Sequence, residues 1–242
     1  MIHVAGLTKS YKDLVAVRDL SFDVAPGEVL GLVGPNGAGK TTTLRCLAGI
    51  LPPTSGTVAI TGHDLKQEPV AAKRQLAFVP DEPQLFEYLT VEEHLQFVAR
   101  IYQVGDAAAR APALLNELEL TEHRQKLPGE LSRGMRQKLA IACGLLHEPG
   151  VLLFDEPLTG LDPVGIRRTK DTILRRAREG AAVVLSSHLL HLVEELCTGV
   201  LIIGRGRRLA YGPLASIVAE RPELKGLALE DVFLAITSAQ SE

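Results

Sequence analysis

One short segment limits what this chain can fold into more than any other feature of its sequence. Residues 34–41 match the phosphate-loop pattern G-x-x-x-x-G-K-[ST], between an apolar run that ends at Val33 and a segment carrying Leu44, Leu47 and Leu51 at helical spacing. A functionless glycine-rich turn is the alternative, but such turns rarely show the whole pattern between a strand and a helix. We therefore predict an α/β fold with a site for phosphate groups.

The residue types of this loop suit a nucleoside triphosphate bound together with Mg²⁺. Glycines let backbone N–H groups turn inward around an anion at the positive end of the following helix. We expect Lys40 to reach the β- and γ-phosphates and the Thr41 hydroxyl to ligate Mg²⁺. The residues of this segment predicted to bind ATP are Gly34, Pro35, Asn36, Gly37, Ala38, Gly39, Lys40, Thr41 and Thr42.

Two adjacent carboxylates follow a second apolar run, residues 151–154. A short, wholly apolar strand is typical of a parallel sheet that is buried on both faces, and ligands gather at the carboxyl edge of such a sheet. Asp155 suits the Mg²⁺ shell, and Glu156 suits a general base that polarises the water beside the γ-phosphate. The alternative, a solvated acidic pair, has less support once the phosphate loop is considered.

The rest of the chain supplies the strands and helices that such a site needs. Short β-forming runs at residues 3–7, 15–24, 28–33, 57–60 and 75–79 alternate with turn signals and predict a mixed sheet. The middle section changes to helical periodicity. Thr90 and Glu93 form a capping-box pattern, residues 107–118 predict a second helix, and Ser132 is the expected N-cap of a third that ends near His147.

A strand–helix–strand crossover follows the middle section. Residues 151–154 and 182–186 are the strands, and the helix between them has Asp162 as its N-cap, Pro163 at its first position and Gly180 beyond its end. The tail adds a predicted hairpin, residues 200–203 and 207–211, and an amphipathic segment at residues 229–236.

The charge, the lengths of the apolar runs and the cysteines constrain the location of the protein but do not identify a partner. The net charge is −3 and the 26 Lys and Arg are scattered, so no nucleic-acid partner is expected. The apolar runs fall short of the roughly 18 residues that cross a bilayer, and no secretory signal is visible, so we expect a cytoplasmic location. Cys46, Cys143 and Cys197 lack metal-type spacing and are expected to be small buried hydrophobes.

The order of these motifs, with residues 131–135 just ahead of the Asp155 strand, resembles the ATP-binding subunit of ABC transporters over essentially the whole chain. The resemblance implies that Tyr11 stacks on adenine and that Asp81 stands near Mg²⁺. It also implies that the signature residues Ser132, Arg133 and Gly134 contact the ATP of a second subunit. Two ATP molecules would then be enclosed in a head-to-tail dimer, and a helix N-terminus such as that at Ser132 suits phosphate oxygens.

Two further residues take their roles from the same resemblance. Asp162 corresponds to the loop that communicates between the two sites, and His188 corresponds to the switch histidine that contacts the γ-phosphate and helps to position the water. Alone, each has a plainer explanation. Asp162 is also a helix N-cap, His188 a polar residue at the start of a helix, and Tyr11 a surface aromatic; the ordered set favours the functional interpretation.

Three positions depart from the family pattern. Asp81 and Met135 replace glutamines, and Arg133 replaces a glycine. Asp81 keeps an oxygen able to approach Mg²⁺ or its water but adds a negative charge near the phosphates. Arg133 could contact phosphate or simply point to solvent, and the sequence does not decide between them. The other expected catalytic positions look intact, which favours a homodimer over a heterodimer with a related ATPase.

The resemblance implies a P-loop NTPase fold: a RecA-like core with a mixed parallel sheet, an antiparallel β subdomain and an inserted helical signature subdomain. Residues 1–242 are expected to form one ABC ATPase domain, with its core at 1–86 and 149–214, the helical subdomain at 87–148 and a C-terminal extension at 215–242. The implied cofactors are ATP and Mg²⁺. The implied partner is a separate transmembrane permease, with export as the expected direction of transport. This partner would hold the chain on the inner face of the cell membrane, and a groove near residues 81–95 would receive its helices.

Two other functions fit the sequence less well. A soluble ABC ATPase that acts on the ribosome or on DNA usually carries two such domains or long coiled-coil insertions, and this chain shows neither, nor a basic stripe. A small-molecule P-loop kinase would have an Arg-rich lid and no signature motif, so residues 131–135 argue against it.

Overall fold

Two β-sheets form the framework of the computed structural model, which describes residues 1–221 and 224–238. Part of the predicted extension, residues 222–223 and 239–242, lies outside the described residues. The larger sheet has the strand order β10-β9-β3-β8-β7-β6. Its strands are β3 (Val29–Val33), β6 (Leu76–Val79), β7 (Val151–Asp155), β8 (Ala182–Ser186), β9 (Gly199–Gly204) and β10 (Arg207–Gly212).

Five strands of the larger sheet run parallel, and β10 pairs antiparallel with β9 at one edge. The central strands β3, β7 and β8 are buried along their whole length, as expected for a sheet covered on both faces. Alternate side chains enter two separate cores. Leu152 and Phe154 of β7 join one apolar cluster, whereas Val151 and Leu153 join the other.

The smaller sheet is antiparallel and has the order β2-β1-β4-β5. Its strands are β1 (Ile2–Tyr11), β2 (Leu14–Val24), β4 (Ser55–Ile60) and β5 (His63–Asp64). Strand β1 extends beyond the predicted residues 3–7 because it pairs with β2 as far as Tyr11 opposite Leu14. This sheet packs with α1 (Lys40–Leu47) against one face of the larger sheet and forms the second core.

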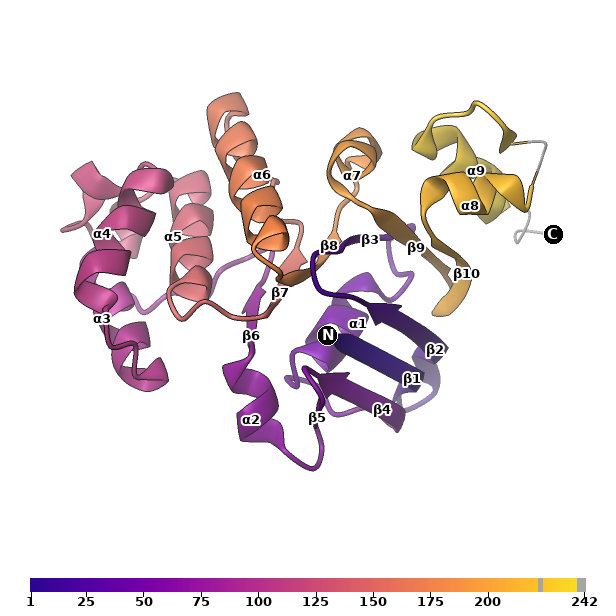
Figure 1. Ribbon diagram of the computed structural model, residues 1–242, viewed down its shortest axis with the longest axis horizontal. Coiled ribbons are helices and arrows are strands. Elements are labelled where there is room, and N and C mark those ends of the chain that lie inside the picture. The colour runs from indigo at the N-terminus through magenta and orange to yellow at the C-terminus, as the bar shows by residue number, and fades with distance from the viewer. Residues whose placement is uncertain (222–223, 239–242) are drawn as a thin grey trace.

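Helices cover the opposite face and both ends of the molecule. Figure 1 shows α3, α4 and α5 grouped at one end, α8 and α9 at the other, and α6 and α7 between them. The helices are α2 (Pro69–Arg74), α3 (Val91–Tyr102), α4 (Ala107–Glu117), α5 (Arg133–Leu145), α6 (Pro163–Arg178), α7 (Leu190–Leu196), α8 (Leu214–Ala219) and α9 (Leu229–Ser238), with 3₁₀ turns η1 (Thr121–His123) and η2 (Pro128–Glu130). No helix within residues 1–221 and 224–238 has the length and apolar character to cross a membrane.

The predicted helix caps are confirmed. Thr90 Oγ1 accepts a hydrogen bond from the Glu93 N–H while the Glu93 carboxylate accepts from the Thr90 N–H, so α3 begins with a capping box. Ser132 caps α5 and Asp162 caps α6. The expectation for the cysteines needs a correction: Cys46 is buried, but Cys143 and Cys197 are only partly buried. All three pack against the cores, and burial raises the pKa of each thiol, to about 11 for Cys46 and about 12 for the other two.

Candidate functional site

The order of the parallel strands brings four predicted segments to one edge of the larger sheet. Strands β3, β8, β7 and β6 are consecutive neighbours, so their carboxyl ends lie side by side. The phosphate loop follows β3, His188 follows β8, Glu156 follows β7 and Asp81 follows β6. This edge is where α/β sheets bind ligands.

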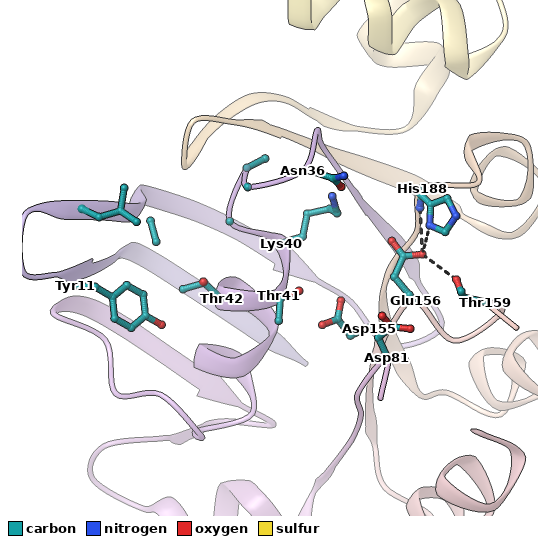
Figure 2. Close-up of a pocket in the computed structure, with 15 residues that line it drawn as sticks. Tyr11, Asn36, Lys40, Thr41, Thr42, Asp81, Asp155, Glu156, Thr159 and His188 are labelled. Atoms are coloured by element: carbon teal, nitrogen blue, oxygen red, sulfur yellow. Dashed lines mark hydrogen bonds and ion pairs between the residues drawn. The ribbon is translucent and has the colours of Figure 1, made fainter. Parts of the chain in front are cut away.

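A cavity of about 520 Å³ opens at this edge. Figure 2 shows Lys40, Asp155 and Glu156 facing one another across it, with Tyr11 at the far side. Most of the predicted ATP-binding, metal and catalytic residues line the cavity, and they are Tyr11, Asn36, Gly37, Ala38, Gly39, Lys40, Thr41, Thr42, Asp81, Asp155, Glu156 and His188. Gly34 and Pro35 lie at the base of the loop, and their carbonyls contact the Lys40 side chain.

The phosphate loop is built around a glycine that no other residue could replace easily. Gly39 has φ +104° and precedes the first residue of α1. A Cβ at this position would lie 2.5 Å from the Ala16 carbonyl oxygen of β2. The loop can therefore turn into α1 and press against β2 only without a side chain, which leaves the N-terminus of α1 open to an anion.

Lys40 lies folded back over the loop that precedes it. Its Nζ donates to the carbonyl oxygens of Gly34 at 2.7 Å and Pro35 at 3.3 Å. Burial lowers the pKa of Lys40, and the negative charges of Glu156 and Asp155 oppose that shift. The ammonium group is thus held among carbonyl oxygens at the position where the phosphates of a nucleotide would enter.

A buried serine, which the sequence analysis missed, contacts the Asp155 side chain and the Glu156 backbone. Ser186 Oγ donates to Asp155 Oδ1 at 2.6 Å and accepts from the Glu156 N–H at 3.1 Å. Ser186 is fully buried and Asp155 is 4% exposed, so this contact fixes the Asp155 carboxylate. The only signal in the sequence was a polar residue that ends the apolar strand β8, directly opposite Asp155 in the register.

Glu156 and His188 are in direct contact. Glu156 has a left-handed backbone, φ +51°, which is uncommon outside glycine and re-aims the side chain after β7. His188 Nδ1 lies 2.8 Å from Glu156 Oε2, and the His188 N–H donates to the same oxygen at 3.2 Å. Thr159 Oγ1 approaches that oxygen at 3.5 Å. Since a carboxylate only accepts, the contact implies that Nδ1 carries the proton.

The donor set fits Mg²⁺ bound together with phosphate oxygens. Within the described part of the chain, no group of three or more His, Cys, Asp or Glu side chains is arranged to hold a metal ion. A hydroxyl from Thr41 and a carboxylate oxygen from Asp155 do line the cavity. Mg²⁺ commonly takes one or two protein oxygens and completes its shell with substrate phosphates and water, so an incomplete protein shell is the arrangement it requires.

The opposite wall of the cavity offers an aromatic ring. Tyr11, at the end of β1, is 42% exposed, and Lys9 Nζ lies 5.2 Å from its ring centroid. Leu14, the cross-strand partner of Tyr11, is 65% exposed and lines the same cavity. Leu14, Ala16 and Thr159 are lining residues that the sequence analysis did not identify, and only the β1–β2 and β7–α6 connections bring them there.

The signature residues and Asp162 do not line this cavity. Ser132 Oγ accepts from the Met135 N–H at 3.2 Å, and Asp162 Oδ1 accepts from the Gly165 N–H at 3.0 Å, so each caps its helix. The start of α5 lies against the loop that precedes α6, because a Cβ at Gly134 would lie 3.0 Å from the Gly160 carbonyl oxygen. Arg133 does reach the cavity indirectly: its Nη2 donates to Asp81 Oδ1 at 3.0 Å.

Comparison with known proteins gives consistent similarities. The family model described as "ABC transporter" matches residues 17–159. The ABC-type transporter ATP-binding protein EcsA of Bacillus subtilis is 33% identical over 239 residues, which is 98% of this chain and 96% of EcsA. The Nod factor export ATP-binding protein I of Paraburkholderia xenovorans is 38% identical over 213 residues, 87% of this chain and 70% of that protein. A solved ATP-binding subunit of an ABC transporter superposes with a TM-score of 0.93 at 35% identity, covering 98% of this chain and 99% of that one.

Proposed function

Because this chain belongs to the family of ABC transporter ATP-binding proteins, we propose that its ATP hydrolysis drives a separate membrane-embedded permease. The observation that carries the mechanism is the convergence of Lys40, Asp155, Glu156 and His188 on one cavity at the carboxyl edge of the parallel sheet. Chain segments more than a hundred residues apart supply these groups. They provide the cationic, metal-binding and proton-accepting functions that hydrolysis of a phosphoanhydride needs.

Each side chain has a defined part in the reaction. The loop N–H groups and Lys40 bind the phosphates, and Tyr11 stacks on the adenine. Thr41 and Asp155 would hold Mg²⁺, which when bound would neutralise charge on the phosphates, and Asp81 lies beside them on the cavity wall. Glu156 accepts the proton of the attacking water. His188 orients the Glu156 carboxylate through Nδ1 and presents its other face to the γ-phosphate.

The signature segment acts on the ATP of a second copy. Ser132, Arg133 and Gly134 stand at the N-terminus of α5, where free N–H groups and a hydroxyl suit phosphate oxygens. They do not line the cavity of their own chain, so a head-to-tail homodimer around two ATP and two Mg²⁺ would place them on the partner's nucleotide. Asp162 and the neighbouring Gly160 then lie where the two sites communicate.

A second cavity, of about 450 Å³, suits a helix of the permease. It lies between the segment after β6 and the helices α3 and α5, and Phe86 (54% exposed) and Phe97 (38% exposed) present apolar surface there. The two phenyl rings pack edge to face at 4.9 Å. His94 holds this wall: its Nδ1 donates to the Thr90 carbonyl oxygen at 2.8 Å, and its Nε2 accepts from the Phe86 N–H at 3.0 Å.

This apolar groove connects directly to the nucleotide site. Pro80, which lines the groove, is followed by Asp81, which lines the nucleotide cavity. A permease helix seated in the groove would therefore sense movement at Asp81 within the same segment. The similarity to a Nod factor export protein supports export as the direction of transport, and coupling to a permease would keep the chain on the cytoplasmic face of the membrane.

The test is recovery of the chain from membranes of its native host in mild detergent, followed by mass spectrometry of stoichiometric partners. We expect a polytopic membrane protein. Phe97→Asp should reduce its recovery about tenfold, because a charge in an apolar interface is costly to desolvate. Leu234→Asp is the control, because Leu234 is an apolar residue of α9 that is even more exposed (56%) and lies away from the groove. Recovery with ribosomes or nucleic acid instead would refute the transport role.

A further inference from the structure

One ion pair joins the signature segment to the nucleotide cavity of the same chain. Arg133, the first residue of α5, donates through Nη2 to Asp81 Oδ1 at 3.0 Å. Asp81 lines the cavity, whereas Arg133 does not. These are two of the three positions that depart from the family pattern, and the structure places the two new charges, of opposite sign, against each other.

The path of the arginine side chain depends on one glycine. Gly160 has φ +77°, and a Cβ there would lie 3.1 Å from Arg133 Cδ and 3.2 Å from Nε. The Arg133 stem therefore lies flat across the Gly160 backbone on its way to Asp81. The contact involves three segments of one chain, which enter from the ends of β6 and β7 and the start of α5.

The cavity carries more negative than positive charge, and the Arg133–Asp81 ion pair offsets part of that excess. Among the described residues that line the cavity, Asp81, Asp155 and Glu156 are carboxylates and Lys40 is a lysine. A nucleoside polyphosphate adds further negative charge beside them. Asp81 is the carboxylate for which a cation is supplied from outside the cavity, and that cation is Arg133.

We propose that Arg133 acts on the nucleotide site of its own protomer, as a positioning residue that neutralises and orients Asp81. Nucleotide affinity of the single protomer then depends on a residue of the signature segment, in addition to the role of that segment toward the partner's ATP. This inference rests on the proposed function, because it requires the cavity to bind ATP. It explains how an aspartate can stand beside the phosphates: the charge that would repel them is paired within the chain.

The test is a double-mutant cycle on nucleotide binding by the monomer. Affinity for Mg²⁺–ADP and Mg²⁺–ATP is measured by calorimetry for wild type, Arg133→Ala, Asp81→Asn and the double variant, at concentrations where sedimentation shows monomers. Arg133→Ala should weaken binding about two- to fivefold, the scale of a half-exposed ion pair. In the Asp81→Asn background the same change should have no effect, and high salt should shrink the loss.

Arg136→Ala is the matched control, since Arg136 stands one turn further along α5 and donates to the Leu131 carbonyl oxygen. The proposal is overturned if Arg133→Ala leaves affinity unchanged, tightens binding, or weakens it equally in the Asp81→Asn background. An equal loss in Arg136→Ala would also overturn it, because it would indicate general damage to α5. Failure of the wild-type chain to bind either nucleotide would instead refute the proposed function.

Discussion

At the scale of single residues, the proposed hydrolysis depends on how tightly Glu156 is held. Its backbone is left-handed, and one carboxylate oxygen accepts from the side chain and the N–H of His188. A glutamate side chain that moved freely would have to be ordered in every catalytic cycle, at a cost in conformational entropy. Here the contacts with His188 already hold the side chain, so the proposed base is oriented before a nucleotide binds.

Glu156→Gln should slow ATP hydrolysis by about 10²- to 10⁴-fold, because the amide keeps the shape of the carboxylate but cannot accept the proton of water. Affinity for ATP should stay close to that of wild type, since the phosphate loop is unchanged. Phosphate release and nucleotide binding, measured on the same preparation, separate the two effects. Glu82→Gln, at an exposed residue after β6, is the control. If the Glu156→Gln variant hydrolysed ATP at the wild-type rate, Glu156 would not be the general base.

Lys40→Ala should weaken binding of Mg²⁺–ATP about 10- to 100-fold, the scale of a lost charged hydrogen bond. The ammonium group is already partly desolvated and held by the carbonyls of Gly34 and Pro35. Little free energy is therefore spent on desolvating it when it contacts phosphate. Calorimetric titration measures the change, with the exposed Lys66→Ala as control. Unchanged affinity would show that the phosphates bind elsewhere.

The sequence predicted the residues of the site better than their contacts. Local patterns identified Lys40, Asp155 and Glu156, because each belongs to a short segment with a recognisable residue order, whereas His188 was identified only through the family resemblance. The Ser186 contacts with Asp155 and Glu156, and the reach of Arg133 to Asp81, involve residues about 30 and 52 positions apart. Such contacts arise from strand order and register, which no local pattern encodes.

At the scale of elements, α4 of the helical region is tied to α6 by a charged contact. Arg175 Nη2 donates to both carboxylate oxygens of Glu117 at 2.7 Å, and Thr172 Oγ1 donates to Glu117 as well. Burial alone would raise the pKa of Glu117, but these hydrogen bonds and the Arg175 charge outweigh it and hold the pKa below its usual value. Movement of the helical region against the core would have to break this contact.

Glu117→Gln should lower the free energy of unfolding by about 1 kcal/mol at pH 7, discounted for a pair that is roughly one-third exposed. A carboxylate with a lowered folded-state pKa stabilises the protein above its unfolded pKa, and the stabilisation is lost as pH falls through the folded-state value. The difference between variant and wild type should therefore shrink from pH 5 towards pH 3. Urea titrations at several pH values measure it, with the exposed Glu122→Gln as control.

Elements with a strong periodic pattern were predicted, and the short ones were not. The capping box of α3, the N-caps of α5 and α6 and the apolar strands β7 and β8 are all confirmed. The six-residue helices α2 and α8 were missed, and the seven-residue α7 begins at Leu190, two residues after the helix start expected at His188. A helix so short shows barely two turns of periodicity and forms through tertiary packing, as α7 does against β3 and α9.

At the scale of the whole molecule, the two halves of the proposed ATP site lie apart in one chain. The cavity holds the phosphate loop, Glu156 and His188, while Ser132 and Gly134 stand at the start of α5, outside it. A second copy related by a two-fold axis would bring each α5 N-terminus to the cavity of the other chain, and the same contact would form twice. The interface would then require nucleotide, because phosphate fills the gap between the halves.

The prediction is that Glu156→Gln sediments as a dimer in saturating Mg²⁺–ATP and as a monomer without nucleotide. Blocked hydrolysis keeps the γ-phosphate in place, and binding of ATP to the closed form alone shifts the equilibrium by mass action. Adding Ser132→Arg to Glu156→Gln should leave ATP bound but abolish the dimer, since a bulky side chain would stand at the start of α5. A Glu156→Gln chain that stays monomeric in saturating ATP, or a dimer indifferent to Ser132→Arg, would contradict the shared site.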